Sequence, residues 1–189
     1  MITQIVIDNF HPVAKPIAAF VKTMTFGPQE YGGHIYKGVG IGYAPEMFYE
    51  LLEAAIGQKV TPKLDFFRLG TKEDSSTTYI HPDSGMAKFA AVWYLTEAPG
   101  DIVAGTAFWK NKGTGKDALS EQDRMNELLL AQLDAEGADE SKWKMTGLVG
   151  QKFNRLVVYP SHLFHSRYPQ DAWGKDASDG RIIFCSFFN

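Results

Sequence analysis

Apolar residues recur at helical spacing in three segments of the chain, with polar residues between them. The segments are residues 12–24, 45–58 and 117–135. In the last segment, helical spacing places Leu119, Met125, Leu128, Leu129 and Leu133 on one face. An apolar stripe of this period predicts an amphipathic helix that packs against a core. We therefore expect three helices.

Elsewhere the apolar residues form short runs that are rich in β-branched and aromatic side chains, as is typical of strands. The runs are residues 5–10, 64–69, 77–81, 88–95, 102–109, 154–159, 164–167 and 181–188. Residues 25–44 are rich in glycine and aromatic residues, and we expect them to form a loop.

The order of these elements predicts the fold class. Two helices followed by many strands, with one helical interruption, do not fit alternating βαβ units. They favour an α+β, mainly β domain: a jelly roll, or double-stranded β-helix, with helices packed outside it. We expect one domain over residues 1–189. Residues 12–58 would give most of the helical support and residues 64–189 the jelly-roll core, with a helical insertion near 117–135.

Composition excludes several classes of partner and location for this protein. The chain has 19 Lys and Arg against 22 Asp and Glu and a formal net charge of −3, which argues against non-specific nucleic-acid binding. The start of the chain does not resemble a signal peptide, and no apolar run approaches the ~18–20 residues that span a bilayer. The single cysteine, Cys185, cannot form an internal disulfide. We expect a cytoplasmic protein without a membrane or nucleic-acid partner.

The segment His81-Pro82-Asp83 and a later histidine can supply two imidazoles and one carboxylate. Such a set holds Fe(II) on one face and leaves the other positions open. The alternative is a surface turn, because Pro82 and Ser84 are turn residues. The later histidine is either His162 or His165. The pattern favours His165, which leads into a new strand after a Pro-Ser turn.

Arg181 begins the last strand, which is otherwise apolar. A buried charge is unfavourable there unless it is paired. Arg181 therefore indicates either an arginine that binds the carboxylate of a ligand or an arginine at the edge of the sheet whose guanidinium reaches water. With a period of two, Arg181 shares a face with Ile183, Cys185 and Phe187. The same period places Tyr79 on the face of His81. There its hydroxyl would bond to a bound carboxylate, or its side chain would only pack inside the barrel.

The chain resembles the Fe(II)/2-oxoglutarate-dependent oxygenase superfamily, most of all its prolyl-hydroxylase-like branch and related bacterial and phage proteins. The resemblance is carried by five segments: His81-Pro82-Asp83, AAVWYL, GTAFWKNKGTG, NRLVVYPSHLFHS and the Gly180-Arg181 that opens the final strand. It implies that His81, Asp83 and His165 bind Fe(II), since the relatives carry Tyr-Pro-Ser-x-x-x-His. It also implies that Arg181 pairs with the distal carboxylate of 2-oxoglutarate.

Two departures from the pattern of the superfamily concern Arg181. An insertion around Asp171–Asp179 precedes it, and Ile183 stands where many relatives have serine. A different hydroxyl, such as that of Tyr79, would have to assist the arginine.

The resemblance implies a hydroxylase that uses O2 and releases succinate and CO2. Halogenases of the superfamily lack the carboxylate that Asp83 supplies, and the nucleic-acid demethylases carry an arginine where this chain has Phe187. The expected substrate is an amino acid or a peptidyl side chain, with Trp109, Arg167 and Trp173 as candidate contacts. Two alternatives are a non-catalytic jelly-roll binding module and a cupin-like metal enzyme that does not use 2-oxoglutarate.

Overall fold

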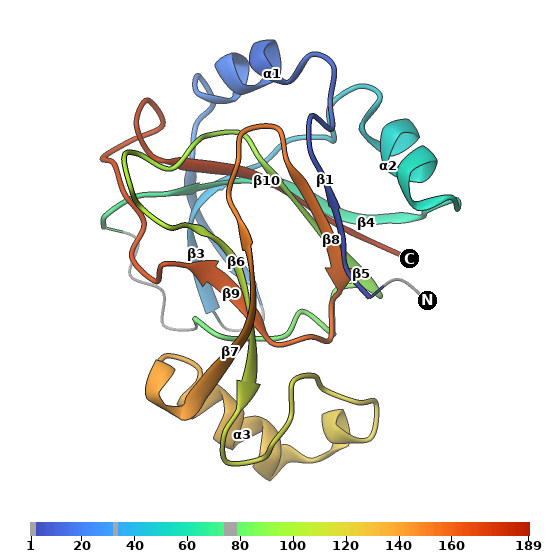
Figure 1. The fold of residues 1–189 in the computed structure, drawn as a ribbon, viewed down its shortest axis with the longest axis vertical. Helices are drawn as coiled ribbons and strands as arrows, with labels where there is room; N and C mark the ends of the chain where they lie inside the picture. The colour runs from blue at the N-terminus through green and yellow to red at the C-terminus, as the bar shows by residue number, and fades with distance from the viewer. Residues whose placement is uncertain (1–2, 32–33, 74–78) are drawn as a thin grey trace.

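The computed structural model describes residues 3–31, 34–73 and 79–189, which form two antiparallel sheets and three α-helices. The larger sheet has seven strands in the order β1-β8-β5-β10-β4-β3-β2, and the smaller has the order β7-β6-β9. The mainly β character that the sequence predicts is therefore confirmed, and the strands of both sheets pair in antiparallel fashion (Figure 1).

The strands of the larger sheet are β1 (Ile5–Ile7), β2 (Gly27–Tyr31), β3 (His34–Gly40), β4 (Pro62–Gly70), β5 (Phe89–Tyr94), β8 (Leu156–Pro160) and β10 (Arg181–Phe188). Those of the smaller sheet are β6 (Gly105–Asn111), β7 (Trp143–Gly150) and β9 (His165–Tyr168). The helices are α1 (Ala14–Val21), α2 (Phe48–Ile56) and α3 (Glu127–Glu136), with short 3-10 turns at η1 (Asp123–Met125) and η2 (Glu140–Lys142).

Three apolar clusters hold these layers together. The first lies between the larger sheet and α1 and α2, and it includes Val21, Leu52, Trp93 and Phe184. In Figure 1 both helices lie at the top of the molecule, whereas α3 lies at the bottom beside the smaller sheet. The cluster beside α3 is built around Trp109, Leu133 and Trp143.

The remaining cluster fills the space between the two sheets. We call the side chains that face this space the inner face. Its apolar members are Ala90, Val92, Tyr94, Phe108, Val157, Tyr159, Ile183 and Phe187. Along β10 the odd-numbered residues belong to the inner face, and Ile182, Phe184 and Phe188 belong to the helix side. Both faces of β10 are thus buried, which explains its continuous apolar run.

Residues 25–44, which the sequence predicts as a loop, contain the strands β2 and β3. These two strands pair with each other, and β3 extends the larger sheet by pairing with β4. One glycine makes the close approach possible: at Gly38, with φ +68°, a Cβ would lie 2.1 Å from the carbonyl oxygen of Leu69. The glycine content that suggested a loop therefore serves strand packing.

The third predicted helix, over 117–135, is wrong in its first half. The helix α3 begins only at Glu127, because Asn126 caps it by accepting a bond from the Leu129 amide at 3.1 Å. Before it, Ser120 and Asp123 bond to each other and form a turn. The predicted apolar face is only partly buried: Leu119 and Leu133 are each 5% exposed, whereas Met125 and Leu128 are each 85% exposed.

The other segments agree more closely with the predictions, with shifts of a few residues at most ends. The strand β7 was not predicted. Of the strand expected at 77–81, residues 77 and 78 lie outside the described residues. The prediction is wrong for the described part, because Tyr79 and Ile80 are not in a strand and His81 forms only an isolated bridge with His165. In the described part of the chain, no helix is both long enough and apolar enough to cross a membrane.

Candidate metal centre

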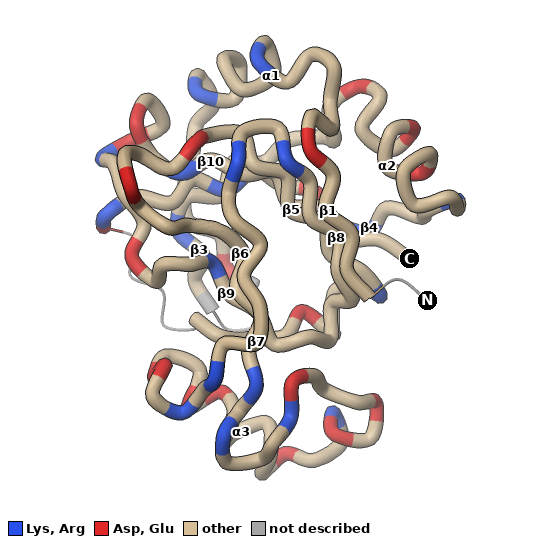
Figure 2. The backbone as a smooth tube through the Cα atoms, in the orientation of Figure 1, with Lys and Arg blue, Asp and Glu red and all other residues tan. Residues whose placement is uncertain are grey.

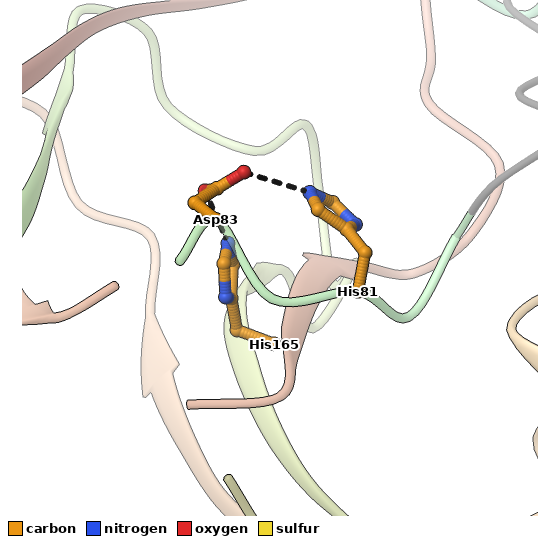
Figure 3. A group of neighbouring side chains, drawn as sticks. All are labelled: His81, Asp83 and His165. Atoms are coloured by element: carbon orange, nitrogen blue, oxygen red, sulfur yellow. Dashed lines mark ion pairs between the residues drawn. The ribbon is translucent and has the colours of Figure 1, made fainter. Parts of the chain in front are cut away.

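His81, Asp83 and His165 come together where the segment after residue 78 crosses the start of β9. The Nε2 atom of His81 lies 3.6 Å from Oδ1 of Asp83, and Nε2 of His165 lies 3.0 Å from Oδ2. All three candidate ligand atoms lie within 4.8 Å of one another (Figure 3). Ligands about 2.0–2.2 Å from one metal are separated by roughly 3 Å, so a small adjustment lets the three share an ion.

The backbone fixes the three residues relative to one another. The His81 amide donates to the His165 carbonyl and the His165 amide donates to the His81 carbonyl, each at 3.0 Å. The Asp83 amide donates to the carbonyl of Ser161 at 2.7 Å. Each ligand is therefore anchored by a main-chain bond to another part of the site, which places the side chains before any ion binds.

The two imidazoles are oriented in the same way. Nδ1 of His81 lies 3.0 Å from the carbonyl oxygen of Tyr79, and Nδ1 of His165 lies 2.9 Å from that of Leu163. A carbonyl only accepts, so in each ring Nδ1 carries a proton, and Nε2 has its lone pair whenever the ring is neutral. Both lone pairs are thus available on the side of Asp83, as metal ligation requires.

The site is largely buried but remains accessible to solvent. The side chain of His165 is 6% exposed, that of Asp83 19% and that of His81 31%. Burial lowers the pKa of His81. For Asp83 burial acts to raise the pKa, but the charge and hydrogen bond of His165 lower it overall. For His165 burial acts to lower the pKa, but the Asp83 carboxylate raises it overall.

These shifts predict how metal binding depends on pH. Without metal, His165 keeps its proton to a higher pH than a free histidine, because the proton is shared with Asp83. A metal must displace that proton, so affinity for Mn(II) should fall by roughly tenfold per pH unit below the pKa of His165 and level off above it. Calorimetric titrations between pH 6 and 8 will measure this slope. An affinity that does not change with pH would contradict a shared proton.

The His165–Asp83 pair also links folding to pH. The raised pKa of His165 stabilises the metal-free fold below the unfolded value of about 6.5, and this contribution is lost as pH rises through the folded value. The thermal shift that Mn(II) produces should therefore be larger at pH 8 than at pH 6.

Arg181 lies on the inner face with its side chain buried, 5% exposed. Its Nε donates to Oε1 of Gln151 at 2.8 Å, and its Nη2 lies 3.4 Å from the carbonyl oxygen of Gly105. Its guanidinium lies over the ring of Tyr94, 5.6 Å from the centroid. The insertion at 171–179 does not displace it, because Arg181 pairs in register with Gly70 of β4.

Tyr79 lies elsewhere than predicted. Its side chain is 2% exposed and belongs to the cluster beside α3, with its ring edge toward Trp109 at 6.2 Å. The period of two does not apply, because the chain from Tyr79 to His81 is not a regular strand. Tyr79 acts on the site through its carbonyl, which orients His81, and not through its hydroxyl.

Two of the three predicted substrate contacts are buried. Trp109 is 3% exposed, belongs to the cluster beside α3 and donates from Nε1 to Ser166 at 2.9 Å. Trp173 is 6% exposed, in the segment between β9 and β10. Neither indole offers much surface to a substrate, so both positions serve packing.

The third, Arg167, is half-buried and follows His165 by two residues on β9, so the two side chains share a face. Its Nε donates to the carbonyl of Gln170 at 2.7 Å. His162, the alternative ligand, is not part of the group that could hold an ion, and its carbonyl accepts a bond from the Leu119 amide.

Sequence reasoning did not identify three polar residues around Arg181. The hydroxyls of Tyr94 and Thr106 bond to each other across the two sheets at 2.6 Å, and Gln151 bonds to the arginine itself. The hydroxyl near Arg181 is therefore that of Tyr94, in place of the predicted Tyr79. A signal was present, because period-two counting along KFAAVWYL places Tyr94 on the same face as Ala90 and Val92.

The fold and the site define a protein of two facing antiparallel sheets with a two-histidine, one-carboxylate group at one end of the space between them. The chain belongs to a family of unknown function, DUF6445, whose model matches residues 74–188. The matched stretch includes His81, Asp83, His165 and Arg181. No curated protein matches this chain in sequence.

Solved structures share the fold. The protein HygX from Streptomyces hygroscopicus, solved with nickel and 2-oxoglutarate bound, is 10% identical with a TM-score of 0.60; the match covers 98% of this chain and 82% of that one. The non-heme alpha ketoglutarate dependent epimerase SnoN from nogalamycin biosynthesis is 12% identical with a TM-score of 0.57, over 98% of this chain and 77% of that one. At these identities the likeness concerns the fold.

Proposed function

We propose that this protein is a non-haem Fe(II)- and 2-oxoglutarate-dependent dioxygenase that hydroxylates an amino-acid or peptidyl substrate. In this proposal His81, Asp83 and His165 hold the iron, and the two sheets form a double-stranded β-helix around it. The observation that carries the proposal is the ligand group itself, with its ligand atoms within 4.8 Å and both histidine Nε2 atoms on the side of Asp83.

The donor set fits iron. Two neutral imidazoles and one carboxylate on a single side leave room for further ligands, which is the arrangement of non-haem Fe(II) oxygenases. A structural zinc site is usually closed by four protein ligands, whereas the group found among the described residues has three. The bound iron would activate O2, and oxidation of 2-oxoglutarate to succinate and CO2 would supply the electrons for hydroxylation.

Arg181 would hold the distal carboxylate of 2-oxoglutarate. It shares the inner face with Tyr159, whose ring lies 4.8 Å from that of His165, so the arginine and the ligand group border the same space. Gln151 and Gly105 fix the guanidinium by accepting bonds from it, and the ring of Tyr94 packs against it. A guanidinium fixed in this way can bind a carboxylate with two parallel bonds. HygX, which shares the fold, was solved with 2-oxoglutarate bound.

The protein would contribute binding, orientation and exclusion of water. Phe108, Val157 and Ile183 line the inner face with apolar groups, so a co-substrate between the sheets would be shielded from solvent. The exposed edge of His81 marks the side from which a substrate can approach.

The test is an anaerobic absorbance titration of metal-free protein with Fe(II) and then with 2-oxoglutarate. A weak visible charge-transfer band that needs both additions is expected, because the keto acid would chelate the iron. Iron binding without a band would favour a metal enzyme that does not use 2-oxoglutarate. A failure to bind iron would favour a non-catalytic binding module.

A further inference from the structure

The strand β8, with the sequence Leu-Val-Val-Tyr-Pro, carries one hydroxyl group and no charged residue (Figure 2). The hydroxyl belongs to Tyr159, which faces the space between the two sheets and is 2% exposed. Tyr159 is neither a member of the ligand group nor a hydrogen-bond partner of Arg181. A polar group on an otherwise apolar, buried strand needs a partner of its own.

The ring of Tyr159 is fixed beside the ligand group. Its centroid lies 4.8 Å from that of His165 and 5.3 Å from that of Phe108, which it meets edge-on. Phe108 and His165 pair in register on β6 and β9, so the ring packs against two adjacent residues of the smaller sheet. Two residues further along the chain, the carbonyl of Ser161 accepts the amide of Asp83. The ring is therefore held in place relative to both His165 and Asp83.

The hydroxyl of Tyr159 makes no hydrogen bond to any residue that the structure describes. The other tyrosine of the inner face, Tyr94, differs in this respect, because its hydroxyl is bonded to that of Thr106 at 2.6 Å. The Tyr159 oxygen is also not completely enclosed by protein atoms, so it opens onto the space between the sheets. Buried hydroxyls nearly always have a partner, and this one is available to a ligand.

The strand register places Tyr159 and Arg181 at different ends of this space. Tyr159 pairs with Ala90 of β5, whereas the guanidinium of Arg181 lies over Tyr94, four residues along the same strand. Four residues of a strand span about 13 Å. A co-substrate that extends from the ligand group to Arg181 would therefore pass the Tyr159 hydroxyl with the end that binds the metal.

The electrostatics agree with a position between the ligand group and Arg181. Burial raises the pKa of Tyr159 well above its usual range, the charge of Asp83 raises it further, and the charge of Arg181 lowers it. The hydroxyl therefore interacts with charges from both ends of the space. It also keeps its proton at neutral pH, which makes it a hydrogen-bond donor to an anion.

We propose that the hydroxyl of Tyr159 donates a hydrogen bond to the carboxylate at the keto-acid end of 2-oxoglutarate. This rests on the proposed function and gives the co-substrate a second contact with the protein, at the opposite end from Arg181. Contacts at both ends fix the orientation of the keto acid, which a single contact at Arg181 would leave free to rotate.

The test compares Tyr159→Phe with wild type in anaerobic titrations with Fe(II) and then 2-oxoglutarate, followed by the visible band. The variant should bind 2-oxoglutarate about tenfold more weakly, as expected when one hydrogen bond to a charged group is lost. The band should move to shorter wavelength, because the donor stabilises the orbital of the keto acid that accepts the electron. Fe(II) affinity should stay within about threefold, since the ring beside His165 remains.

Pyruvate, a keto acid without the distal carboxylate, identifies the end at which Tyr159 acts. Tyr159→Phe should weaken the binding of pyruvate to the Fe(II)-loaded protein by about the same factor as that of 2-oxoglutarate, because the lost bond is at the shared end. Arg181→Gln should weaken the binding of 2-oxoglutarate and leave that of pyruvate nearly unchanged. The two variants would thus affect opposite ends of one molecule.

Two further variants control for folding and for the loss of a hydroxyl as such. Tyr168→Phe removes a hydroxyl from β9 on the side of the cluster beside α3, and it should leave both affinities within about twofold of wild type. Tyr159→Met also lacks the donor and should reproduce the loss of 2-oxoglutarate affinity if Tyr159→Phe does not fold. Thermal unfolding of metal-free Tyr159→Phe should match wild type, because the hydroxyl has no partner to lose.

The outcomes separate this inference from the function on which it rests. A band in wild type, with unchanged 2-oxoglutarate affinity and an unshifted band in Tyr159→Phe, would overturn the inference and leave the proposed function standing. Weaker binding of 2-oxoglutarate without weaker binding of pyruvate would place Tyr159 at the distal carboxylate, and an equal loss of Fe(II) affinity would make it a support for His165. Either result would contradict the inference. Absence of the band in wild type would refute the proposed function and the inference together.

Discussion

Replacing His165 with alanine is expected to weaken Fe(II) binding by at least about 100-fold and to abolish the absorbance band with 2-oxoglutarate. The change removes one of three ligands and leaves Asp83 without the imidazole that lies 3.0 Å away. Loss of an outer partner of a metal ligand already costs about 10–100-fold in affinity, so loss of a ligand should cost more. Equilibrium titration with Fe(II) under anaerobic conditions measures the effect.

The neighbouring His162 gives a matched control for this variant. It lies in the same Pro-Ser-His-Leu-Phe-His segment and is outside the ligand group. His162→Ala should therefore keep Fe(II) affinity within about threefold of wild type, as expected of a substitution away from a functional site. If the two variants lost the metal equally, the assignment of His165 as the ligand would fail.

Replacing Arg181 with glutamine is expected to weaken 2-oxoglutarate binding by about 100-fold while Fe(II) affinity stays nearly unchanged. Removing one member of a buried charge pair costs about 2–5 kcal/mol, and each 1.4 kcal/mol is about tenfold in affinity. Iron affinity is spared because the guanidinium of Arg181 donates to Gln151 and Gly105 and not to the three ligands. The band intensity as a function of 2-oxoglutarate concentration gives the affinity.

Two further variants sharpen this prediction. Arg181→Lys keeps the charge but loses the planar fork, so its affinity should fall between those of wild type and glutamine. Lys63→Gln removes an exposed cation near the start of β4, whereas Arg181 pairs with Gly70 at the end of that strand, so this variant should behave like wild type. Unchanged affinity for 2-oxoglutarate in Arg181→Gln would show that Arg181 does not bind the co-substrate.

The sequence predicts those parts of the site that depend on local pattern. His81 and Asp83 are two residues apart, and period-two counting along the last strand places Arg181 with Ile183 and Cys185. The fold class follows in the same way, because the strands β5, β8 and β10 are apolar runs of ordinary strand length.

The features that sequence reasoning missed depend on contacts between distant segments. Tyr79 was assigned to the wrong face because period-two counting assumes a regular strand, and this segment has only a single bridge to His165. The strands β2 and β3 are stable because they join β4, which their own composition does not reveal. The leucines of the segment 117–135 follow helical spacing over its whole length. The turn at Ser120 and the cap at Asn126 nevertheless keep the residues before Glu127 out of the helix.

The reciprocal main-chain bonds between His81 and His165 have a consequence for how the protein folds. The two residues are far apart in the sequence, and β5, β6, α3, β7 and β8 all lie between them. The chain must close this long loop before the ligands can meet, so the site should form late, after most of the entropy of loop closure has been lost. A metal that binds only the closed chain would then slow unfolding more than it speeds folding. In stopped-flow refolding with and without Mn(II), the time at which the metal binds would show when the native topology is complete.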